Sequence, residues 1–139
     1  MINPNISIAV LNLPWPTYLD ARRGRRLAVH LTGWVEDFHH PHNWVVPYMT
    51  SAGAFSAAQS FPDEMYAEFE DLINQGVREL DPAKADAIYR QLQKLSNDYA
   101  IDIFISQPTG RRYFQRWIHG FFYNPLYPGP LAYFLTKEE

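Results

Sequence analysis

Two amphipathic segments in direct succession constrain the fold of this 139-residue chain most. In residues 63–80 and again after Asp81, apolar side chains recur at steps of three and four residues, as on one face of an α-helix. Asp81 is a favourable N-cap and Pro82 a favourable first residue of a second helix, which we expect to end near Asn97. Gly76 should weaken the first helix. The apolar faces comprise Met65, Phe69, Leu72, Ile73, Val77 and Leu80, then Ala85, Ile88, Tyr89, Leu92 and Leu95. The pattern predicts a helical hairpin.

Three shorter segments, residues 5–11, 27–31 and 101–105, alternate apolar side chains with other residues at the period of a β-strand. Between the first two, residues 17–22 predict a short helix that ends at Gly24. A strand, a helix and a second strand in this order predict a βαβ unit with parallel strands. The expected fold class is therefore α/β, with a small sheet that contains the βαβ unit and with the helical hairpin beside it.

Less regular segments complete the chain. Residues 33–62 have little periodic pattern, and a loop of this length inside a compact domain is usually functional. Residues 111–118 fit either a fourth strand or irregular structure, and an aromatic, proline-rich tail follows Gly120. We treat residues 1–139 as a single domain, since this length is sufficient for one hydrophobic core.

The composition indicates a surface that binds a ligand or another protein. Hydrophobic residues make up 47% of the chain and aromatic residues 16%. Charged residues make up only 19%, below the usual value of about 25%. We expect the aromatic excess to form a pocket wall or an interface, and a homodimer held by these side chains is one arrangement that we consider.

Charge and residue usage exclude several classes of protein. A net charge of −3 provides no general basic field for nucleic acid, and we expect the short basic cluster at residues 22–26 to be a solvated turn. The absence of cysteine excludes disulfides, thiolate metal sites and cysteine nucleophiles. No stretch approaches the roughly 20 apolar residues of a membrane span. The first residues do not form a signal peptide, so we expect the signal of an exported parent protein to lie upstream.

Six short motifs occur in order along nearly the whole chain. They are Gly33-Trp34-Val35-Glu36-Asp37, Pro41-His42-Asn43-Trp44, Pro62-Asp63-Glu64, Asp81-Pro82-Ala83-Lys84, Gln107-Pro108 and Gly120-Phe121-Phe122-Tyr123-Asn124-Pro125. No single motif is specific, but their order and spacing resemble the C-terminal lobe of the family 5 extracellular solute-binding proteins. These proteins are the capture subunits of dipeptide, oligopeptide and nickel ABC importers. The resemblance implies one lobe of a periplasmic-binding-protein-like fold, whose N-terminal lobe is missing here.

The resemblance also implies a function and a site. A periplasmic or membrane-anchored extracellular protein would capture a peptide or another small solute and deliver it to ABC permease subunits, without a cofactor and without catalysis. In peptide-binding members the Asp of Gly-Trp-x-x-Asp pairs with the terminal ammonium of the ligand, a role that falls to Asp37. Trp34 would form an apolar wall, and Gly33 would allow close backbone approach. Phe38 and His39 complete the expected ligand-binding residues.

Two considerations leave the ligand and the site open. Some peptide-binding relatives carry a basic residue shortly before Gly-Trp, but this chain has Leu31 and Thr32 there, so a sugar, an opine-like compound or another solute is also compatible. From the residues alone, without the resemblance, we would predict that Asp37 caps a loop and that Trp34 lies in the core. Because the family cleft lies between two lobes, we expect the chain alone to bind ligand weakly or not at all.

A metal site is the alternative hypothesis. His39, His40 and His42 lie beside two carboxylates, and such ligands suit zinc or nickel in a metal-binding protein or a metal-dependent hydrolase. Their spacing matches no standard metal motif, which favours ordinary loop histidines.

Other catalytic arrangements have less support. Ser51 and Ser56 lack a Gly-x-Ser-x-Gly motif, and the adjacent carboxylates Glu36 and Asp37 are not expected to face one site. The sequence therefore favours a binding protein over an enzyme.

Overall fold

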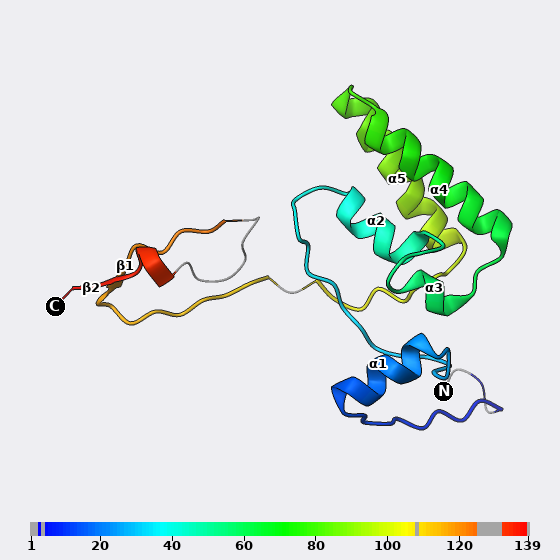
Figure 1. Cartoon of the computed structure of the whole chain (residues 1–139), viewed down its shortest axis with the longest axis horizontal. Coiled ribbons are helices and arrows are strands. Elements are labelled where there is room, and N and C mark those ends of the chain that lie inside the picture. Colours follow the sequence, from blue (N-terminus) through cyan, green and yellow to red (C-terminus); the bar gives the residue numbers. More distant parts are fainter. Residues whose placement is uncertain (1–2, 4, 108, 125–131, 139) are drawn as a thin grey trace.

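The computed structural model describes residues 3, 5–107, 109–124 and 132–138, and within them the chain is mainly helical (Figure 1). The elements are α1 (Trp15–Arg23), α2 (His42–Met49), α3 (Ser56–Gln59), α4 (Asp63–Arg78), α5 (Pro82–Asp98), β1 (Ile118–His119), a 3-10 helix (Ala132–Phe134) and β2 (Thr136–Lys137). Helices α2 to α5 form one group, and the hairpin of β1 and β2 lies apart from it (Figure 1). Within the described ranges, no helix is long and apolar enough to cross a membrane.

The hydrophobic core lies where α4 packs against α5 and α2 packs against α4. It consists of Val45, Met49, Phe69, Leu72, Ile73, Tyr89 and Leu92. The predicted helical hairpin is confirmed, because the three-four spacing of these apolar residues is the one that places them on facing helix surfaces. The apolar face predicted for residues 63–80 is wrong at its C-terminal end. Helix α4 ends at Arg78, and Val77 and Leu80 are 50% and 95% exposed.

The start of α5 follows the prediction from the sequence. The Asp81 carboxylate accepts hydrogen bonds from the backbone N–H groups of Ala83 at 2.9 Å and Lys84 at 3.4 Å. These two groups have no partner within the helix, so the side chain satisfies donors that would otherwise rely on water. Pro82 then occupies the first helical position, where its missing N–H is not needed.

Gly76 lies at the close approach of α4 and α5. A Cβ atom at this position would lie 3.0 Å from Cζ of Tyr89 and 3.3 Å from Cγ2 of Ile88. The glycine therefore lowers the propensity of α4 but allows the two helices to meet closely, a role that the sequence did not reveal.

Replacing Gly76 with valine should lower the free energy of unfolding by about 1–3 kcal/mol, because the added methyl groups overpack the interface. Urea denaturation followed by circular dichroism measures the change. Asn74→Val is the matched control, since Asn74 is exposed on the same helix and acquires the same β-branched side chain. Equal stability of the two variants would contradict close packing at Gly76.

The expected α/β fold with a βαβ unit is wrong. The sheet in the described residues has two short strands, paired antiparallel with Ile118 opposite Lys137 and His119 opposite Thr136. Residues 5–11, 27–31 and 101–105 are not strands. Most of their apolar side chains are exposed, for example Ile8 at 79%, Val29 at 87% and Ile103 at 86%, whereas Leu27 is half-buried and Ile101 packs against the core. Alternation shows which side chains would share a face, but a strand also needs a paired neighbour, which the period does not supply.

The remaining segments agree in part with expectation. Helix α1 begins at Trp15, two residues before the predicted start, and ends at Gly24 as predicted. The presumed loop of residues 33–62 contains α2 and α3, so it is partly helical. Residues 111–118 are irregular except at Ile118. The motif residues Pro108 and Pro125 lie outside the described residues.

Candidate ligand-binding site

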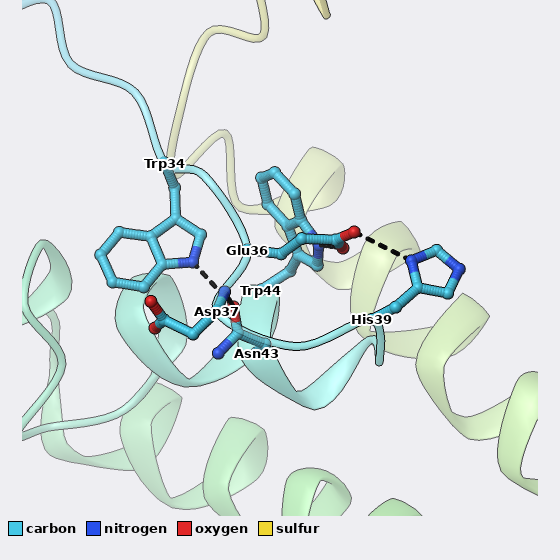
Figure 2. Close-up of polar contacts among 6 residues, drawn as sticks. All are labelled: Trp34, Glu36, Asp37, His39, Asn43 and Trp44. Atoms are coloured by element: carbon cyan, nitrogen blue, oxygen red, sulfur yellow. Dashed lines mark hydrogen bonds and ion pairs between the residues drawn. The ribbon is translucent and has the colours of Figure 1, made fainter. Parts of the chain in front are cut away.

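Asn43 organises the segment that precedes α2. Its side chain is buried, with 8% exposed, and its Oδ1 atom accepts two hydrogen bonds. One comes from Nε1 of Trp34 at 3.1 Å and the other from the backbone N–H of Asp37 at 3.0 Å (Figure 2). A single buried oxygen thus fixes the two residues that the sequence assigned to ligand contact. The sequence placed Asn43 within a motif but gave it no role.

The indole of Trp34 belongs to a small aromatic group. It meets the ring of Phe55 edge-on, with 5.9 Å between centroids, and Phe55 stacks on Tyr48 at 4.6 Å. Trp34 is half-buried, whereas Phe55 is buried. The indole is therefore held on one side by the helical group and through its N–H by Asn43, which leaves part of it accessible.

The Asp37 carboxylate is exposed. Within the described part of the chain it forms no hydrogen bond or ion pair, and Figure 2 shows it beside the Trp34 ring, directed away from Glu36 and His39. Asp37 thus does not cap the loop; its own N–H is capped by Asn43. The other expected contact residues are exposed too: Gly33 has open space around it, Phe38 is 42% exposed and the His39 side chain 79%.

Glu36 is directed to the other side of the loop. Its carboxylate lies 2.9 Å from Nδ1 of His39 and accepts a hydrogen bond of 3.1 Å from Nε1 of Trp44 (Figure 2). These bonds, the one with His39 first, hold the pKa of Glu36 below its usual value. Glu36 and Asp37 therefore have separate surroundings and do not form an acid–base pair.

The three histidines of this region have different partners. His39 is directed at Glu36, His40 meets the ring of Tyr89 edge-on at 5.6 Å, and the backbone N–H of His42 donates to Nδ1 of His40 at 3.1 Å. Burial, followed by the nearby His40, lowers the pKa of His42. Over the residues that the structure describes, no three His, Asp or Glu side chains are placed to share a metal ion.

Both candidate serines have structural partners. The buried hydroxyl of Ser56 donates to the carbonyl of Thr50 at 2.5 Å, and the hydroxyl of Ser51 donates to Oε1 of Glu70 at 2.7 Å. The hydrogen bonds from the Ser51 hydroxyl and N–H lower the pKa of Glu70. These contacts tie α2, α3 and α4 together, and neither hydroxyl is paired with a histidine.

A second polar cluster, between α1 and α3, was missed by the sequence analysis. The guanidinium of Arg22 lies over the Phe55 ring, 4.8 Å from its centroid. Nε2 of Gln59 donates to Oδ1 of Asp102 at 3.1 Å. Burial raises the pKa of Asp102, whereas burial and then Arg22 lower the pKa of His30, against the opposing effect of Asp102. The expected solvated turn at residues 22–26 is therefore wrong for Arg22.

Arg26 agrees with the solvated turn expected at residues 22–26, because it is exposed and forms an ion pair of 2.6 Å with Asp20. No periodic signal could have placed Asp102 beside Gln59, because the two are distant in sequence.

The predicted ligand contacts form an open surface. Two shallow, open hollows of the described chain lie elsewhere, one lined by Arg116, Trp117, His119, Lys137 and Glu138, the other by Gln75, Arg78, Glu79, Leu80 and Ile88. Neither includes residues 33–39. Any enclosed site around Asp37 thus needs a second wall.

Comparisons with known proteins give one distant relative. No family model matches the chain, and no solved structure does. Among curated proteins, the chain has distant similarity to a family 5 solute-binding protein. This relative is the periplasmic oligopeptide-binding protein OppA of Escherichia coli (strain K12), 22% identical over 120 residues. The match covers 86% of this chain and 21% of OppA, so the chain spans about one fifth of its relative's length.

Proposed function

We propose that this chain is part of the substrate-binding component of an ABC importer. It would form the C-terminal lobe of a two-lobed protein that captures a peptide or another small solute outside the cytoplasmic membrane and delivers it to permease subunits. The distant similarity to OppA supports the class of protein. The observation that carries the proposed site is the Asp37 carboxylate, exposed and unpaired among the described residues, beside a Trp34 ring that the same Asn43 oxygen holds.

This arrangement suits the recognition of an ammonium group. A carboxylate and an ammonium form a charge-assisted hydrogen bond, which is stronger than a bond between neutral groups. Because Asn43 fixes the backbone at Asp37 before any ligand arrives, less conformational freedom is lost on binding. A second lobe that closes over the surface would exclude water and strengthen the interaction.

The neighbouring residues indicate the chemistry of the ligand near its ammonium group, but not that of any carboxylate it carries. Trp34 offers an apolar surface beside the carboxylate, which suits the aliphatic part of an amine-bearing solute. Leu31 and Thr32, which precede the motif, bring no cation for a ligand carboxylate. The proposed ligand therefore carries a free ammonium group, and a peptide with a free N-terminus is the first candidate.

A titration with trialanine, followed by NMR at the Asp37 amide and the Trp34 indole N–H, tests the proposal. We expect saturable shifts with a dissociation constant of roughly 1 mM or weaker, because one lobe supplies half of the contacts. N-acetyl-trialanine lacks the ammonium group and should cause no saturable shift. Equal binding of both peptides would contradict recognition of ammonium, and micromolar affinity of the chain alone would contradict the two-lobed protein.

Asp37→Asn should weaken trialanine binding about tenfold or more, because the charged acceptor is lost. Asp71→Asn is the matched control, since it removes the same charge from an exposed position on α4. If both variants bound trialanine like the wild type, Asp37 would not be the anchor.

A further inference from the structure

The C-terminal part of the chain has a net positive charge, whereas the rest has a net negative charge. Residues 103–139 contain four of the twelve Lys and Arg residues, namely Arg111, Arg112, Arg116 and Lys137, and two of the fifteen Asp and Glu residues, Glu138 and Glu139. The remainder of the chain is correspondingly acidic. Such a charge asymmetry within one chain is typical of proteins that bind a polyanion or a charged surface.

The fold brings some of these cations together. Arg116 precedes β1 and Lys137 ends β2, and the antiparallel pairing of the two strands places both on one hollow with Trp117, His119 and Glu138. The backbone N–H of Glu138 donates to the carbonyl of Trp117 at 2.9 Å, which extends the pairing beyond the strands. We call Arg116, Trp117, His119 and Lys137 the basic hairpin surface.

Aromatic side chains flank this surface. Some hold the hairpin together: Phe114 lies 4.9 Å from Phe121, and Phe122 lies 5.4 Å from Phe134, between ring centroids. Others remain exposed, with Tyr113 at 87% and Tyr133 at 93%. Even the paired Phe122 and Phe134 are 47% and 51% exposed, so the hairpin presents apolar rings to solvent together with its cations.

Exposed Trp, Tyr and Phe rings among Arg and Lys side chains match the chemistry of a membrane–water interface. Aromatic rings lie at the level of the lipid headgroups, and long cationic side chains reach the phosphates. Phe rings have no polar group, and their partial exposure favours insertion below the headgroups over contact with a hydrated polyanion. Because the hairpin lies apart from the acidic helical group, a flat anionic surface can meet it without meeting that group (Figure 1).

We propose that the C-terminal hairpin binds an anionic phospholipid surface peripherally, through the basic hairpin surface and its flanking aromatic rings. The phosphate groups would pair with Arg116 and Lys137, while Trp117 and neighbouring rings enter the interface. This proposal is independent of the solute-binding function and of the site around Asp37.

Co-sedimentation of the full chain with lipid vesicles tests the proposal. We expect binding to vesicles that contain phosphatidylglycerol, little binding to pure phosphatidylcholine vesicles, and a loss of binding as salt screens the charges. Equal binding to both vesicles would overturn the electrostatic part of the proposal. Tighter binding to a single-stranded oligonucleotide than to the anionic vesicles, at the same salt, would overturn the choice of lipid.

The double variant Arg116→Glu with Lys137→Glu should lower partitioning to anionic vesicles about tenfold or more. Each Lys or Arg near an anionic membrane surface typically strengthens binding several-fold, and the variant removes two of them. Arg23→Glu with Lys84→Glu is the matched control, because it changes the net charge equally at exposed positions outside the hairpin. An equal loss in the control would show a general charge effect and overturn the proposal. Arg116→Gln with Lys137→Gln, together with circular dichroism, separates a loss of lipid contact from a loss of folding.

Discussion

Phe69→Ala is expected to destabilise the helical group more than any other truncation of a core side chain proposed here. Phe69 is 0% exposed and meets the rings of Phe61 and Tyr99. Its truncation leaves a cavity between α4 and the elements around it, which typically lowers the free energy of unfolding by about 3–5 kcal/mol. Small domains are stable by only about 5–15 kcal/mol, so this loss is a large fraction of the whole stability. Circular dichroism at increasing urea concentrations measures the effect.

Phe104→Ala provides the control for the same side-chain change. Phe104 is 70% exposed and lies outside the core, so its truncation should change the free energy of unfolding by about 0.5 kcal/mol or less. If Phe104→Ala destabilised the chain as much as Phe69→Ala, the Phe104 ring would be packed in a way that the described structure does not show.

The second large effect is expected at Asn43. Asn43→Ala removes the acceptor shared by the Trp34 indole and the Asp37 backbone, and leaves two donors without their partner. We expect a loss of about 2–3 kcal/mol in the free energy of unfolding. The Trp34 indole N–H resonance should move towards the position of a solvated indole, and trialanine binding should weaken with it.

Asn43→Asp and Asn74→Ala distinguish the role of this oxygen from general helix effects. Asn43→Asp keeps an acceptor oxygen and should retain the Trp34 resonance, whereas Asn74 is exposed on α4 and its change to alanine should be nearly neutral. A wild-type indole resonance in Asn43→Ala would show that Asn43 does not hold the site.

The helical part of the fold was predictable because its signals are local. The two long helices and their contact follow from apolar residues spaced three and four apart and from the Asp81-Pro82 pair. Each of these signals spans only a few consecutive residues. The position of the α4 terminus was not predictable from the pattern, since the apolar residues Val77 and Leu80 continue it into solvent.

The sheet was wrongly predicted because strand pairing is not local. Residues 5–11, 27–31 and 101–105 have the period of strands, but each needs a neighbour far along the chain. In the described structure the two paired strands are Ile118–His119 and Thr136–Lys137, and both are too short to show an alternating pattern.

The residues of the candidate site could be selected from the sequence, but the side chains that hold them in place could not. The Gly-Trp-x-x-Asp motif brought Trp34 and Asp37 to attention, and the structure places them around one Asn43 oxygen. Their assignment as ligand contacts stays a prediction. Arg22 and Asp102 could not be found, because a charged residue gives no periodic signal of its burial.

The electrostatic interaction of His30 with Asp102 bears on how the helical group is connected to the rest of the chain. The chain reaches the helical group after His30 and leaves it after Asp102, and the two side chains are close enough for each to influence the pKa of the other. Folded units whose ends lie close together can be accommodated within another polypeptide as inserts. Residues 31–101 thus have the geometry of an insert: a longer protein could carry them on two adjacent connections and turn them as one body.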